Sequence, residues 1–179
     1  MGIPTLISTA TASGASSVDI TSGITSSYDE YMFVFTAINA ATDATRLTFQ
    51  VNADGESGYN ETITSTAFNA YHAESDEGTP LVAYAAGLDQ AQGTSAQYIC
   101  SDMGNGADES AAGILHLFNP SSTTYVTHWY SRFVTNRYDD VIGEFFMGGY
   151  INTTAAIDEV QFKMSSGNMD AVIKMYGVG

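Results

Sequence analysis

Residues 28–38, with the sequence YDEYMFVFTAI, constrain the fold more than any other stretch of the chain. Successive side chains of a β-strand point to opposite faces of its sheet. Read with that period, one face carries Phe33 and Phe35, and the other carries Met32, Val34 and Ile38. Because both faces are apolar, we predict a central strand with one face in a sandwich core. The other face, with Met32, Val34 and Ile38, is the candidate subunit interface.

Short segments of strand-like sequence, about ten in number, follow one another along the chain, separated by turn residues. In residues 127–134, for example, Trp129 and Phe133 fall on one face and Tyr130 and Val134 on the other. No segment shows a sustained helical period. Such spacing is typical of antiparallel sandwiches and jelly rolls. The predicted fold is all-β: a single antiparallel β-sandwich of jelly-roll type, with little helix.

Two connections between strands resemble hairpin loops. Residues 52–58 contain Asp-Gly and two further turn signals, and follow a segment in which Phe49 points inward and Gln50 outward. Residues 165–168 separate a segment with Phe162 inward from one with Ile173 inward, so we expect a terminal hairpin. The pair Gly148–Gly149 predicts a bulge or a close approach of two backbones.

The first residues differ in composition from the rest, being rich in Thr, Ser and Ala, and Pro4 restricts them to an extended arm or a sheet edge. A chain of 179 residues fits a single domain with its own core. We therefore predict an N-terminal extended arm or first strand in residues 1–14 and one β-sandwich domain in residues 15–179.

The charge of the chain excludes several classes of partner. Five basic residues stand against twenty acidic ones, giving a net charge of −15, which argues against nucleic acid and against an anionic membrane surface. No apolar run approaches the ~18 residues that span a bilayer, and the N-terminus lacks a secretory signal, so we expect synthesis in a host cytoplasm. The single cysteine, Cys100, reads as a small apolar strand residue.

Candidate chemistry is sparse in the sequence. His72, His116 and His128 lack metal-binding spacing, although His116 and His128 would meet, as a weak metal site, if their strands pair. Neighbouring acids point to opposite faces of a strand and make poor catalytic pairs. Residues 52–56 resemble a calcium loop only in part. We predict no catalytic, cofactor-binding or metal residues, and assign the many tyrosines to core and interface before sugar stacking.

Three stretches carry a resemblance to a known family: LISTATAS (residues 6–13) leading into residues 28–31, LHLFNPSSTTYV (residues 115–126), and VQFKMSSGN (residues 160–168) with IKMYG (residues 173–177). Together they resemble virion structural proteins of tailed phages of marine and freshwater bacteria, cyanophages among them. The resemblance implies a non-enzymatic component of the particle and provides no catalytic residues.

From the resemblance and the residues together we expect a virion structural protein on the particle surface. It would be a homo-oligomer, expected as a trimer, contacting capsid or tail proteins as a head decoration or cement protein or a small docked appendage. No adaptor and shaft precede the central strand, which favours the head over a tail fibre. The alternative is a tail-fibre or baseplate module that binds host-surface polysaccharide, and the third hypothesis is a free carbohydrate-active enzyme.

Overall fold

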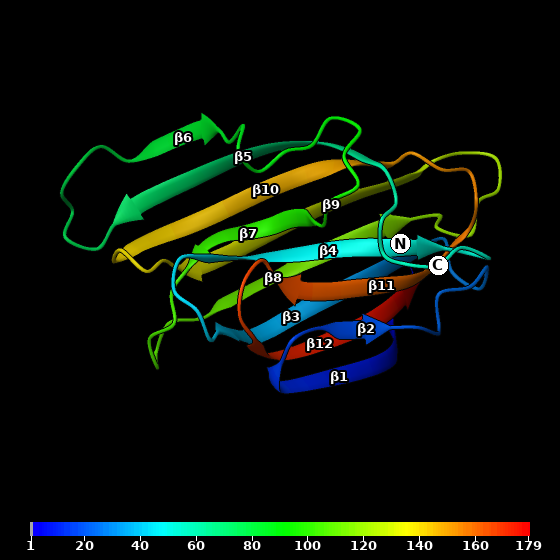
Figure 1. The fold of residues 1–179 in the computed structure, drawn as a ribbon, viewed down its shortest axis with the longest axis horizontal. Helices are drawn as coiled ribbons and strands as arrows, with labels where there is room; N and C mark the ends of the chain where they lie inside the picture. The colour runs from blue at the N-terminus through cyan, green and yellow to red at the C-terminus, as the bar shows by residue number, and fades with distance from the viewer. Residues whose placement is uncertain (1) are drawn as a thin grey trace.

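Two antiparallel sheets packed face to face make up the fold (Figure 1), and the structure, a computed structural model, describes residues 2–179. The larger sheet has eight strands, in the spatial order β1 (Thr5–Ala15), β12 (Met169–Val178), β3 (Glu30–Ala40), β8 (Ala111–Phe118), β9 (Thr127–Asn136), β10 (Val141–Ile151), β5 (Ile63–Ala73) and β6 (Leu81–Tyr84). The smaller sheet has four, in the order β2 (Val18–Ile20), β11 (Ile157–Met164), β4 (Thr45–Ala53) and β7 (Gln97–Met103). The predicted all-β sandwich is confirmed.

The strand pairings are nested along the chain. β1 pairs with β12 in the larger sheet, and β2 pairs with β11 in the smaller one. Further in, β3 with β8, β4 with β7, and β5 with β6 continue the same alternation between the sheets. This nesting is the wrapping of a jelly roll. Among residues 2–179, no helix is long and apolar enough to cross a membrane.

Aromatic rings join the two sheets across the core. Phe162 of β11 lies edge-on to Phe33 and Phe35 of β3, with ring centroids 5.4 and 4.9 Å apart. Phe49 of β4 meets Trp129 of β9 at 4.9 Å in the same arrangement. Edge-on aromatic pairs contribute about 0.5–1.5 kcal/mol beyond the area they bury. The inward residues predicted for β3, β4, β9 and β11 therefore form one shared core.

Strand β3 departs from the predicted alternation near its end. Its first half follows the prediction, with Phe33 and Phe35 buried. At Ala37 the backbone adopts φ +51°, and the pairing with β8 shifts between Phe35 and Ile38. This β-bulge adds a residue to one strand and reverses the facing of the residues after it. Ile38 is consequently 0% exposed, so its prediction as an interface residue is wrong.

The predicted terminal hairpin is also wrong, although its turn and its inward residues are right. Residues 165–168 turn the chain from β11 in the smaller sheet to β12 in the larger sheet. Phe162 and Ile173 are both buried, but they belong to opposite sheets of the sandwich. Alternation identifies the buried face of each segment and leaves open whether two neighbouring segments share a sheet.

Residues 52–58 likewise do not close a hairpin, because β4 belongs to the smaller sheet and β5 to the larger one. Loops instead fold back over the outer side of β4. Gln50, predicted to point outward into solvent, is buried, and its amide donates to the backbone carbonyls of Glu61 at 2.9 Å and Thr94 at 3.2 Å. The outer side of the smaller sheet is thus partly covered by its own connections.

The N-terminal segment is an edge strand of the larger sheet. β1 pairs antiparallel with β12 from Thr5 opposite Gly177 to Ala15 opposite Met169, with two irregularities in register. The predicted boundary between residues 14 and 15 therefore falls inside a strand. Met1 lies outside the described residues.

The glycine pair of β10 is a site of close backbone approach. β10 keeps unbroken register with both neighbours through Gly148 and Gly149, so the predicted bulge is absent from this strand. A Cβ atom on Gly149 would lie 2.2 Å from the carbonyl oxygen of Thr64, whereas a Cβ atom on Gly148 would meet only ordinary contacts from 3.5 Å. Gly149 thus lets β5 approach β10, and Gly148 leaves an open space on the other side of the sheet.

Candidate functional site: the outward face of the larger sheet

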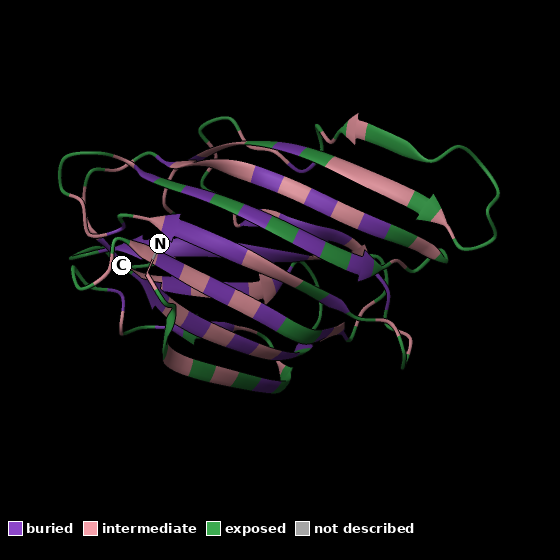
Figure 2. Cartoon of the chain, turned by 180° about the vertical axis from the view of Figure 1, so that it is seen from behind, coloured by how far each residue is buried: buried purple, intermediate pink, exposed green. Residues whose placement is uncertain are grey.

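The larger sheet presents one face to the core and the other to solvent, and no second layer of residues 2–179 covers the latter (Figure 2). Cross-strand partners in register point to the same face of a sheet. We define the outward face as the outward-pointing residues of four strands: Ala112, Ile114, His116 and Phe118 of β8; His128, Tyr130, Arg132 and Val134 of β9; Ile142, Glu144, Phe146, Gly148 and Tyr150 of β10; and Thr64, Thr66, Phe68, Ala70 and His72 of β5.

Large apolar side chains are concentrated on the outward face and its border. Among residues 2–179, eleven large hydrophobic residues are exposed, and four of them, Phe68, Tyr130, Val134 and Ile142, stand on this face. Val82 and Tyr84 of β6 extend it, because they pair with Ala70 and Phe68. Isolated exposed apolar residues are ordinary on a protein surface, whereas a contiguous group of this kind marks an interaction site.

The aromatic rings of the outward face are stacked on one another and held in place. Phe68 and Phe146 lie parallel, with centroids 4.8 Å apart and planes 6° from each other. His116 stacks on Tyr130 at 4.6 Å, and Phe118 lies 5.7 Å from the same ring. Rings fixed by their neighbours lose little rotational freedom when a partner covers them. The face is therefore preorganised for contact.

Only one acid and one base stand on the outward face, and they neutralise each other. Arg132 Nε donates to Glu144 Oε1 at 2.6 Å, and the guanidinium carbon lies 5.0 Å from the centre of the Phe146 ring. No other Lys, Arg, Asp or Glu is present among the residues that define the face. A formally neutral face is unusual on a chain that carries a net charge of −15.

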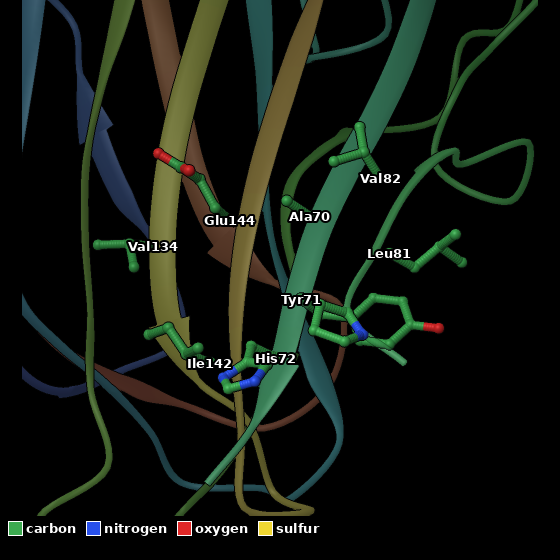
Figure 3. Close-up of a pocket in the computed structure, with 9 residues that line it drawn as sticks. Ala70, Tyr71, His72, Leu81, Val82, Val134, Ile142 and Glu144 are labelled. Atoms are coloured by element: carbon green, nitrogen blue, oxygen red, sulfur yellow. The ribbon is translucent and has the colours of Figure 1, made fainter. Parts of the chain in front are cut away.

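Two hollows shape the border of the face beside Val134. A groove of about 480 Å³ runs from Val134 and Ile142 to Leu81 and Val82, with Glu144 on its wall (Figure 3). A second hollow of about 400 Å³ shares Val134 and Glu144 with the first and extends to Val34 of β3. The two are continuous across the sheet and lined mainly by apolar side chains.

A third hollow, of about 300 Å³, lies over Gly148. Phe68, Tyr130 and Phe146 surround it, and it exists because Gly148 has no side chain. The outward face thus carries protruding rings next to depressions of comparable size.

The predicted interface residues are placed unevenly by the structure. Met32 and Val34 pair with His116 and Ile114 of β8, are partly exposed, and extend the outward face on to β3. Ile38 is buried in the core and cannot contact a partner. Most of the face comes from β9, β10 and β5, which the sequence analysis did not assign to an interface. On these strands, polar residues such as Arg132 stand between the apolar residues of the same face, so the sequence shows no apolar face there.

The histidine neighbours predicted from strand pairing do lie on adjacent strands, because Phe118 pairs with His128 and His116 with Tyr130. Each histidine is otherwise engaged. His116 Nδ1 contacts the Glu30 carboxylate, and His128 lies against Tyr150. In residues 2–179, no group of three or more His, Cys, Asp or Glu side chains is arranged to hold a metal ion.

The loop that partly resembles a calcium site is tied to its own backbone, since the Asn52 amide donates to the Glu56 carbonyl oxygen at 3.2 Å. Near it, burial raises the pKa of Tyr59, and the hydroxyl donates to Glu159 Oε2 at 3.0 Å, which raises the pKa further. Burial also raises the pKa of Asp158, helped by the charge of Glu159. These contacts are structural ones between a loop and strand β11.

Cys100 is fully buried in β7, and burial raises the pKa of its thiol to about 12. The thiol stays protonated near neutral pH, so it behaves as the small apolar residue that the sequence predicts.

No family model matches the chain, and no curated protein is significantly similar to it.

Proposed function

We propose that this chain is a non-enzymatic structural protein on the surface of a tailed-phage virion. It would act there as a homo-oligomeric head decoration or cement protein, or as a small docked appendage. The observation that carries the proposal is the outward face, which is neutral, apolar and preorganised on an otherwise acidic molecule. A protein with such a face functions by burying it, and decoration and cement proteins hold a particle together by burial.

The family resemblance supports the same function. Its three stretches fall on β1, on β8 with the loop that follows it, and on β11 with β12. These elements include an edge strand and two inner strands of the larger sheet and one inner strand of the smaller sheet, so the resemblance concerns the scaffold that displays the outward face. The strong negative charge fits a particle surface, because like-charged particles do not aggregate.

Immunogold electron microscopy on particles of a phage that encodes this chain tests the proposal. An antiserum against the purified chain should label intact particles, and the position of the gold separates heads from tails. Particles that remain unlabelled, together with absence of the chain from the proteins of purified particles, would contradict the proposal. A phage lacking the gene supplies the matched control for the antiserum.

A second function is favoured by one observation, the exposed rings beside open hollows. Tyr130 lines the hollow of about 300 Å³ over Gly148, together with Phe68 and Phe146, and aromatic faces can stack on pyranose rings. A tail-fibre or baseplate module that binds host-surface polysaccharide would use them in this way. A glycan array with the purified chain, and adsorption assays with the antiserum, test this alternative. Binding that is lost on Tyr130→Ala would support it.

A further inference from the structure

We propose that the outward face docks against another copy of this chain. The pairing of copies rests on the proposed function, because it names the partner that this face meets in the homo-oligomer. Three properties of the face carry the proposal: its size, its charge and its shape.

The size of the face matches that of a subunit interface. β3, β8, β9, β10 and β5 lie side by side, and strands about 4.8 Å apart with roughly ten residues rising ~3.4 Å each cover about 24 Å by 34 Å, or ~800 Å². A stable interface removes about 800 Å² from each partner. This side of the sheet is therefore large enough for a stable contact.

The charge of the face selects a second copy over other partners. Two molecules of net charge −15 repel each other over most of their surfaces. The Arg132–Glu144 pair neutralises itself, and the one acid that β3 adds on this side, Glu30, lies against His116. The outward face therefore carries little net charge, and two copies meet the least repulsion there. An anionic lipid or nucleic acid would instead need the basic cluster that the face lacks. An identical neutral face on another copy meets the requirement.

The shape of the face provides both halves of an interface. Tyr130 protrudes with 44% of its surface exposed, beside the hollow of about 300 Å³ over Gly148. Val82 protrudes on the border with 71% of its surface exposed, and it lines the groove of about 480 Å³. Contacts between identical molecules need knobs and depressions on the same surface. Burying these side chains in the hollows of another copy would give the dense packing found at the centre of interfaces.

Size-exclusion chromatography with multi-angle light scattering on the purified full chain tests the proposal. We expect a mass of two or more chains for the wild type. Phe68→Glu places a charge on the outward face and should weaken self-association at least about 100-fold, because like charges brought together in a desolvated interface are strongly unfavourable. Val134→Glu, two strands away on β9, should have the same effect. Far-UV circular dichroism should show that both variants remain folded.

The matched control is Tyr138→Glu. Tyr138 is 45% exposed, as is Phe68, and it lies in the turn after β9, off the outward face. This variant adds the same charge and should keep the mass of the wild type. A wild-type monomer, or an oligomer that Phe68→Glu and Val134→Glu leave intact, would overturn the proposal.

The two experiments separate this inference from the proposed function. A monomeric chain that is nevertheless found on particles refutes docking between copies and leaves the virion assignment standing. An oligomer that Phe68→Glu dissociates, from a chain absent from particles, supports the docking and refutes the virion assignment. A monomer that binds polysaccharide through Tyr130 assigns the face to the glycan instead and overturns the proposal.

Discussion

Replacing Phe162 with alanine tests whether β11 packs against β3 across the core. Phe162 is fully buried and lies edge-on to Phe33 and Phe35 of the opposite sheet, at 5.4 and 4.9 Å. Truncating a buried Phe to Ala costs about 3–5 kcal/mol, and the two ring pairs place this site in the upper part of that range. We expect the free energy of unfolding to fall by about 4–5 kcal/mol.

Urea denaturation followed by circular dichroism measures this change. With a denaturant dependence of about 2–3 kcal/mol per molar urea, the midpoint should fall by about 2 M. Tyr125→Ala is the matched control, because Tyr125 is exposed in the loop before β9, and its midpoint should move by no more than about 0.2 M. Combining Phe162→Ala with Phe35→Ala should give less than the sum of the two effects.

The outcome that refutes the reasoning is a small loss. A midpoint shift below about 0.5 M for Phe162→Ala would mean that the ring does not join the two sheets. Additive effects of Phe162→Ala and Phe35→Ala would lead to the same conclusion. Either result would mean that the two sheets do not meet at this ring.

Three further predictions concern single positions. Gly149→Ala should lower the free energy of unfolding by about 1–3 kcal/mol in urea titrations, because its Cβ would collide with the Thr64 carbonyl oxygen; Gly148→Ala, with ordinary contacts, should leave it nearly unchanged. The Cys100 thiol, with a pKa of about 12, should resist alkylation by iodoacetamide at pH 8 and react fully in denaturant, and rapid labelling of the folded chain would contradict its burial. Asp158→Asn should raise the thermal midpoint at pH 7, because the raised pKa of this carboxyl means that its charge destabilises the folded state. Protonation relieves that penalty, which is absent below the ordinary pKa of 3.8, grows as pH rises from there to the raised pKa, and is complete above it. The difference between Asp158→Asn and the wild type should therefore vanish in acid.

Period-two alternation made the faces of individual strands predictable from the sequence. In β9, Trp129 and Phe133 are buried and Tyr130 and Val134 are exposed, as the pattern of residues 127–134 predicts. The inward positions of Phe162 and Ile173 follow from the same rule. Which residues of a strand share a face depends only on their spacing along that strand, so it can be predicted from a short stretch of sequence.

Sheet membership and bulges were not predictable in this way. The turn at residues 165–168 has the composition of a hairpin, yet it carries the chain between sheets, and only pairing with distant strands decides which occurs. The bulge at Ala37 places a non-glycine residue at φ +51°, which an uninterrupted apolar pattern does not signal. The buried position of Ile38, and the loss of one candidate interface residue, follow from that single angle.

The outward face was predictable only in part, because it is assembled from strands that are distant in sequence. Met32 and Val34 were identified from an apolar run on one strand. Phe68 and Phe146 become neighbours only through the pairing of β5 with β10. A face built from alternate side chains of several distant strands produces no continuous apolar run in the sequence.

Hydroxyl-radical footprinting of the chain, read by mass spectrometry, tests the burial of the outward face most directly. The oligomer, or the intact particle, is compared with the Val134→Glu monomer, which keeps the stacking of Phe68 on Phe146. The account predicts that Tyr130 and Phe146 are strongly protected in the assembly, whereas Tyr125 and Tyr138 are modified equally in both. Equal modification of Tyr130 and Phe146 in the assembly and in the monomer would contradict the account, because the face would then be open to solvent where it is claimed to be covered.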